Sequence, residues 1–168
     1  MKHIKRFSIE YPVSYHSIAN KMTTLTFLFT CCFIGIAFAR SDEDIKKWFI
    51  MQALECSKEH PVSGDEIELM KNHKIPNHQN AKCLVACLFK KVDWIDDKGM
   101  FNDKNAYKMS EKEYPGDQAR LDNAKKLYET CMSVNEASVG DDKEGCERAA
   151  LLATCLTEHA PKMGFIIQ

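Results

Sequence analysis

The segment AKCLVACLFKKV, residues 81–92, carries the clearest helical pattern in the chain. Its apolar residues recur at the three- and four-residue spacing of one helix face. Cys83 and Cys87 are four residues apart, so their side chains leave the helix in nearly the same direction. Each of them is therefore expected to pair with a different neighbouring element rather than with the other.

Five further segments on either side of this one read as helices, and none reads convincingly as a strand. They begin near Ser41, Ser63, Asp103, Asp117 and Gly140. The composition is that of a globular protein, with 45% hydrophobic residues, 28% charged residues and a formal net charge of −1. The sequence therefore predicts an all-α fold, a bundle of six helices.

The N-terminal region reads as a secretion signal. Residues 25–39, LTFLFTCCFIGIAFA, carry no charge but are too short for the ~20 residues that span a bilayer. The run ends in Ala37-Phe38-Ala39, the small-x-small pattern of a signal-peptide cleavage site. We predict a signal peptide at residues 1–39, with an extended basic n-region, and a secreted domain at residues 40–168 with no membrane contact. A true start at Met22 and a retained membrane anchor remain alternatives.

Removal of this leader changes the number of cysteines that remain to form disulfides. Two of the eight cysteines leave with it, and six remain, an even number that predicts three disulfides in an oxidising compartment. Cys146 and Cys155 are nine residues apart, on opposite faces of the last helix, so they too require different partners. Excluding that pair and the Cys83–Cys87 pair leaves about ten of the ~15 possible connectivities.

The cysteine spacing, C-x26-C-x3-C-x43-C-x14-C-x8-C, resembles that of the insect odorant-binding family, also called the pheromone-binding/general odorant-binding family. The resemblance covers residues 40–168, and the closing segment at residues 161–167 is also similar to that of the family. It implies a small, secreted, all-helical domain that encloses an apolar pocket. It also implies an interlocked disulfide pattern, with the pairs Cys56–Cys87, Cys83–Cys146 and Cys131–Cys155.

The function expected from this resemblance is non-enzymatic transport of small hydrophobic ligands such as odorants or pheromone-like semiochemicals. A secreted interaction or effector protein with the same scaffold is the alternative. The expected partners are the ligand, an odorant receptor and a second copy in a weak homodimer. Candidate ligand-binding residues are apolar side chains, several of them adaptable methionines. They are Trp48, Met51, Met70, Leu84, Leu88, Met109, Met132, Leu152, Phe165, Ile166 and Ile167. Ordinary core packing is the alternative for each of them.

His159 is a candidate pH switch, because it lies just before Pro161 and imidazole titrates near pH ~6.5. Its protonation would loosen the C-terminal tail. Some members of the family release ligand on acidification, whereas a solvated histidine at a helix end is the alternative for this chain.

Other function classes find little support in the sequence. It contains no G-x-S-x-G, H-E-x-x-H or P-loop motif, so no catalysis is expected. Cys83-x3-Cys87 departs from the usual C-x2-C zinc spacing, so no metal or other cofactor is expected. A pI of about 6.6 and the lack of a basic block argue against nucleic acid as a partner.

Overall fold

A computed structural model of the chain describes residues 40–140 and 144–165. In this part the chain forms six α-helices and two short 3-10 helices, and no strand. The α-helices are α2 (Asp42–Cys56), α3 (Gly64–Lys71), α4 (Gln79–Lys91), α5 (Asp103–Glu113), α6 (Gln118–Cys131) and α7 (Cys146–His159). The 3-10 helices are η1 (Met132–Asn135) and η2 (Ala160–Met163). The predicted all-α class is confirmed; the predicted signal peptide lies outside the described residues.

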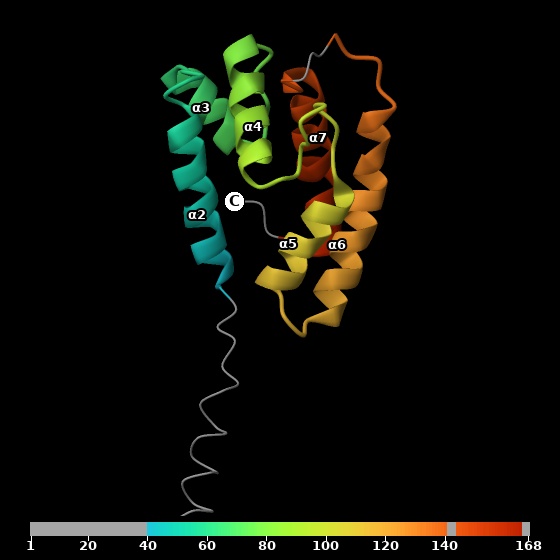
Figure 1. Cartoon of the computed structure of the whole chain (residues 1–168). Helices are drawn as coiled ribbons and strands as arrows, with labels where there is room; N and C mark the ends of the chain where they lie inside the picture. The colour runs from blue at the N-terminus through green and yellow to red at the C-terminus, as the bar shows by residue number, and fades with distance from the viewer. Residues whose placement is uncertain (1–39, 141–143, 166–168) are drawn as a thin grey trace, which may run out of the picture. The chain divides into compact units, whose positions relative to one another are not determined.

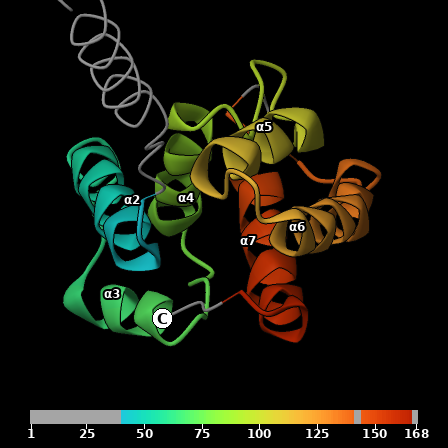
Figure 2. The ribbon, with the colours of Figure 1, turned by 90° about the horizontal axis from the view of Figure 1, so that it is seen from below.

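The helices pack around a central pair, α4 and α7. Helix α2 packs against α4, while α5 packs against α6, and α6 in turn lies against α7. Figures 1 and 2 show the same arrangement, with α2 and α3 on the α4 side and α5 and α6 on the α7 side. The helix predicted at residues 81–92 is thus one of the two central helices of the bundle.

Three disulfides join these helices in the pairing that the family resemblance implies. Cys56–Cys87 links α2 to α4, Cys83–Cys146 links α4 to α7, and Cys131–Cys155 links α6 to α7. The loop closed by each of the first two disulfides contains one cysteine of the disulfide that follows it in the sequence. The three disulfides are therefore interlocked. Cys83 and Cys87 do pair with different helices, as their position on one helix face requires.

Side-chain caps fix several of the helix starts. The Ser41 Oγ accepts a hydrogen bond from the Asp44 amide at the start of α2. Ser63 and Glu66 form the capping box that opens α3. The Asp117 carboxylate accepts from the Arg120 amide at the start of α6. A polar side chain at these positions satisfies amide groups that have no partner inside the helix.

The last helix begins later than the predicted start near Gly140. Helix α7 starts at Cys146, and Gly145 before it has a φ of 66°, in the left-handed region. A residue with these dihedrals cannot continue a right-handed helix, so Gly140 lies outside α7. A Cβ on Gly145 would lie 2.9 Å from the Cα of Gly99, so this turn requires glycine on two counts.

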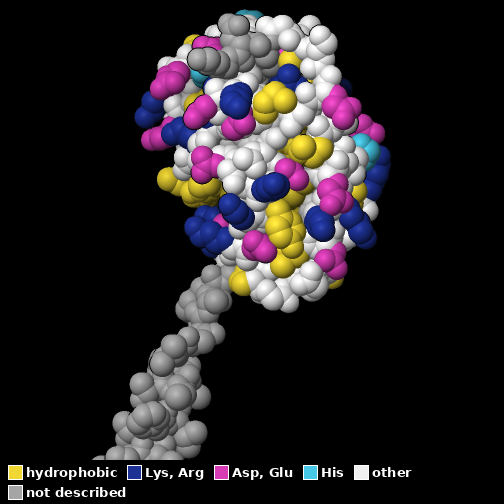
Figure 3. Space-filling view, turned by 45° about the vertical axis from the view of Figure 1, so that its right-hand side comes forward, with side chains coloured by type: hydrophobic (Ala, Val, Ile, Leu, Met, Phe, Trp, Pro, Cys, Tyr) yellow, Lys and Arg dark blue, Asp and Glu magenta, His cyan; other side chains and the backbone are white. Residues whose placement is uncertain are grey.

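The core is built mainly from the inner faces of α4, α6 and α7. Ala149, Leu152 and Ala153 of α7 are buried there together with Phe89 of α4 and Tyr128 of α6. In the described ranges, no helix is long and apolar enough to cross a membrane. On the face drawn in Figure 3, basic and acidic side chains are interspersed, and hydrophobic side chains form separate patches among them. This face therefore offers no continuous basic surface to a phosphate backbone.

Candidate ligand-binding site

An apolar cavity of about 180 Å³ lies among residues of α2, α5, α6, α7 and η2. We refer to it as the apolar cavity. Its lining residues come from both halves of the bundle and from the segment that follows η2. They are Ile45, Phe49, Trp94, Met109, Ser110, Glu113, Tyr114, Leu127, Tyr128, Leu156, Ala160 and Phe165. A concave, mostly apolar site with a few polar groups is the usual form of a small-molecule pocket.

One wall of the cavity is a cluster of aromatic rings centred on Trp94. The Trp94 ring stacks on Phe89 at a centroid distance of 5.6 Å. It also makes edge-on contacts with Tyr128 at 5.5 Å and Phe49 at 6.2 Å. Such ring pairs have preferred geometries and hold one another in place. This wall is therefore fixed by packing from α2, α4 and α6.

Three polar groups stand out among the residues around the cavity. The hydroxyls of Ser110 and Tyr128 are 2.8 Å apart and share a hydrogen bond. Burial raises the pKa of Tyr128 to about 12, so this phenol keeps its proton at physiological pH. The third group is the indole Nε1 of Trp94, which is buried and has no hydrogen-bond partner in the described part of the chain.

Glu113, the last residue of α5, supplies a buried carboxylate that also lines the cavity. Its side chain is only 5% exposed, and it forms an ion pair with Arg40, whose Nε donates to Glu113 Oε2 at 2.7 Å. The Arg40 guanidinium also lies 5.2 Å from the centre of the Trp48 ring. Since a buried carboxylate requires a partner, Arg40 is held against α5 by charge and against α2 by ring contact.

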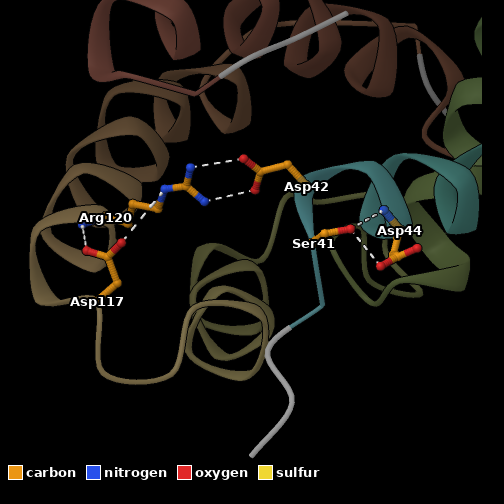
Figure 4. A network of polar contacts seen from close by, with 5 residues as sticks. All are labelled: Ser41, Asp42, Asp44, Asp117 and Arg120. Atoms are coloured by element: carbon orange, nitrogen blue, oxygen red, sulfur yellow. Dashed lines mark hydrogen bonds and ion pairs between the residues drawn. The ribbon is translucent and has the colours of Figure 1, made fainter.

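A second, polar hollow of about 320 Å³ adjoins this ion pair and shares Glu113 and Tyr114 with the apolar cavity. Figure 4 shows the contacts on one side of it. Both terminal nitrogens of Arg120 donate to the Asp42 carboxylate, at 2.8 and 3.0 Å. The same guanidinium lies 4.7 Å from the centre of the Tyr114 ring. These contacts fasten the start of α2 to α6 beside the cavity.

The structure places the sequence-predicted ligand residues in several environments. Met109 and Phe165 line the apolar cavity. Leu84 and Leu152 are buried, whereas Trp48, Met70, Leu88 and Met132 are partly buried outside the lining. Met51 is 64% exposed and does not line the cavity. Ile166 and Ile167 lie outside the described residues. A ligand role for any of these residues stays a prediction.

Most of the lining was not predicted, although the sequence held a signal for part of it. Ile45 and Phe49 are four residues apart on α2, so they lie on the same helix face, whereas Met51 lies on a different face. Tyr128 belongs to the apolar stripe of α6. Trp94, by contrast, lies in the turn after α4, where helical periodicity gives no information.

Two further candidates can be placed. His159 is the last residue of α7 and is partly exposed, and its role as a pH switch stays a prediction. Cys83 and Cys87 are both in disulfides, so neither offers a zinc ligand. The cluster of Cys83, Glu144 and Cys146 likewise contains a disulfide instead of free thiolates.

These features define a class: an all-helical protein, held by three interlocked disulfides, with an apolar cavity between its helices. The comparison with family models identifies the group within this class. The PBP/GOBP family model matches residues 38–159, and the chain belongs to this family.

Two known proteins are similar to the chain in sequence. General odorant-binding protein 19d of Drosophila melanogaster is 23% identical over 148 residues, covering 88% of this chain and 95% of that protein. General odorant-binding protein 28a of the same species is 28% identical over 136 residues, covering 79% of this chain and 91% of that protein.

Two solved structures are similar in fold. The structure of odorant-binding protein 28a of Drosophila melanogaster has a TM-score of 0.58 at 23% identity and covers 75% of this chain and 100% of its own. Odorant binding protein 5 of Apis mellifera has a TM-score of 0.59 at 15% identity, with 77% and 100% covered. The similarity supports the helical bundle as the shared fold.

Proposed function

We propose that this protein is a secreted, non-enzymatic carrier that binds small hydrophobic molecules in the apolar cavity. The observation that carries the proposal is the cavity itself, which is lined almost wholly by apolar and aromatic side chains. Transfer of an apolar molecule from water into such a site is favourable by about 25 cal/mol for each Å² removed from water. Solubilisation of a poorly soluble compound requires no chemistry beyond this.

The disulfides support the same role. An unfilled apolar space in a core costs folding free energy, because its lining loses packing contacts. Three cross-links, closing loops of 31, 63 and 24 residues, offset that cost. The fold can therefore keep an open cavity without losing cooperativity.

Membership of the family supports a proposal for the ligand class and for the location. The names of both Drosophila relatives describe odorant binding, which makes volatile semiochemicals the first compounds to examine. The predicted signal peptide at residues 1–39 and the three disulfides favour extracellular fluid as the place where the protein acts.

The proposal is tested by titrating the oxidised protein with an apolar fluorescent probe and then adding volatile alcohols, esters and ketones as competitors. We expect saturable binding of one probe per chain, displaced by some of the competitors. If the disulfide-bonded protein takes up no probe, the carrier function is wrong, and a protein partner becomes the object of the search.

A further inference from the structure

The outer side of α2 exposes three large apolar side chains. Ile50, Met51 and Leu54 are 50%, 64% and 63% exposed. Single apolar residues are common on protein surfaces, whereas several that share one helix face form a patch that suits a partner. Helix α2 packs against α4, and Figures 1 and 2 show it at the edge of the bundle. The apolar face of α2 is therefore open to contact from outside.

Charged residues extend this patch along the length of the helix. Glu43 and Lys47 precede the apolar residues, and Lys58 lies in the turn that follows α2, where Ser57 keeps right-handed dihedrals. All three charged residues are exposed. At about 100° per residue, they and the apolar residues fall within a sector of roughly 100°, so they face the same way. We call this set the outer stripe: Glu43, Lys47, Ile50, Met51, Leu54 and Lys58.

The outer stripe is complementary to itself when two copies of α2 lie antiparallel. It has an acidic end, an apolar centre and a basic end, so reversing one copy brings opposite charges together at both ends. A two-fold axis makes each contact twice. A lysine in such a contact covers apolar surface with its aliphatic stem. The opposed pairs are Ile50 with the partner's Met51, Lys47 with the partner's Leu54, and Glu43 with the partner's Lys58.

Charge also favours a second copy over a lipid surface as the occupant. The first turn of α2 contains Asp42, Glu43 and Asp44. These carboxylates would be repelled by the anionic headgroups that attract peripheral proteins. In the antiparallel pair, by contrast, the acidic end of each helix lies beside the basic end of the other.

We propose that the outer stripe is a homodimer interface, in which two copies of this chain pair antiparallel across a two-fold axis. The residues of α2 that line the apolar cavity, Ile45 and Phe49, are not part of the stripe, so the inference is independent of the carrier function. One helix face offers less than the ~800 Å² per partner of a standard interface. The dimer is therefore weak, with a dissociation constant between about 10 µM and about 1 mM.

Sedimentation velocity of the secreted, disulfide-bonded protein over this concentration range tests the proposal without any ligand. Leu54→Gln removes an apolar contact at two symmetry-related places. Leu151→Gln is the matched control, because Leu151 is also exposed but belongs to α7. Two further variants, Glu43→Lys and Lys58→Glu, are measured singly and as an equimolar mixture. Circular dichroism first shows that every variant is folded.

We expect the wild type and Leu151→Gln to dimerise alike, and Leu54→Gln to weaken the dimer at least about tenfold. Glu43→Lys and Lys58→Glu should each weaken it about threefold or more, because each sets like charges opposite one another. Their mixture should dimerise like the wild type, since a pair of one copy of each has opposite charges at both ends.

Three results would each overturn the inference. They are a wild type that stays monomeric throughout the range, a dimer that Leu54→Gln leaves intact, and a mixture that associates no better than its two components. None of them bears on the carrier function, which the probe titration tests separately.

Discussion

Gly145 shows how one residue fixes the position of a helix. Its φ of 66° and the 2.9 Å between a built Cβ and Gly99 make it a position for glycine alone. We predict that Gly145→Ala lowers the free energy of unfolding by about 2 kcal/mol, measured by urea denaturation of the oxidised protein. Gly140→Ala is the control, because a Cβ there meets nothing within 4 Å. Equal effects of the two substitutions would contradict this explanation.

The ion pair of Asp42 with Arg120 makes the stability of the fold depend on pH. The hydrogen bonds from Arg120 lower the pKa of this carboxyl below its ordinary value of 3.8. A lowered pKa in the folded state means that the pair stabilises the fold above the unfolded pKa and is lost as the pH falls through the folded pKa. The stabilisation is therefore complete near neutral pH and disappears below about pH 4.

Asp42→Asn should therefore lower stability at pH 7 by less than about 1 kcal/mol, because the pair is partly exposed to solvent. The difference from wild type should shrink as the pH is lowered from about 4 to about 2. Thermal unfolding over this range measures it. In an Arg120→Ala background, Asp42→Asn should have little further effect at pH 7, and a full additional loss there would show that the ion pair is not the cause.

Residue patterns also show why the cavity lining was hard to predict. Helix α2 carries Trp48, Phe49, Ile50 and Met51 in succession, so apolar side chains point in every direction and the pattern does not choose a buried face. The structure turns Phe49 inward, whereas Ile50 and Met51 stay exposed. Packing against the neighbouring helices makes this choice, and a single sequence does not contain it.

At the scale of the elements, the cysteines hold the central helices together. Cys83–Cys146 closes a loop of 63 residues between α4 and α7, the pair at the centre of the bundle. We predict that replacing both cysteines with alanine costs about 4 kcal/mol, since a longer loop leaves more entropy in the unfolded chain. Cys131→Ala/Cys155→Ala, with a loop of 24 residues, should cost slightly less, about 3.5 kcal/mol. Guanidinium denaturation compares them, and a loss under about 1 kcal/mol for the first variant would contradict the prediction.

Helix positions were largely predictable, because they depend on local signals. The predicted helix starts near Ser41, Ser63 and Asp117 are confirmed, as is the amphipathic helix around Cys83 and Cys87. The start of α7 was predicted wrongly, because Gly140 resembles a helix boundary as closely as Gly145 does. What distinguishes them is the approach of Gly145 to Gly99, a contact between distant parts of the chain.

At the scale of the whole molecule, the disulfide-linked bundle leaves space between its helices. Leu156 of α7 lines the apolar cavity, whereas Leu151 of the same helix is exposed and does not. A tryptophan at 156 would occupy much of the space available to a ligand. The same substitution at 151 adds an indole at the surface, where it touches no part of the cavity.

The comparison of Leu156→Trp with Leu151→Trp is the most direct test of the cavity as the ligand site. The measurement is titration of each oxidised variant with the apolar fluorescent probe, after circular dichroism has shown that both are folded. The account predicts that Leu156→Trp weakens probe binding at least about tenfold and that Leu151→Trp binds like the wild type. Undiminished binding by a folded Leu156→Trp variant would show that the ligand lies elsewhere in the protein.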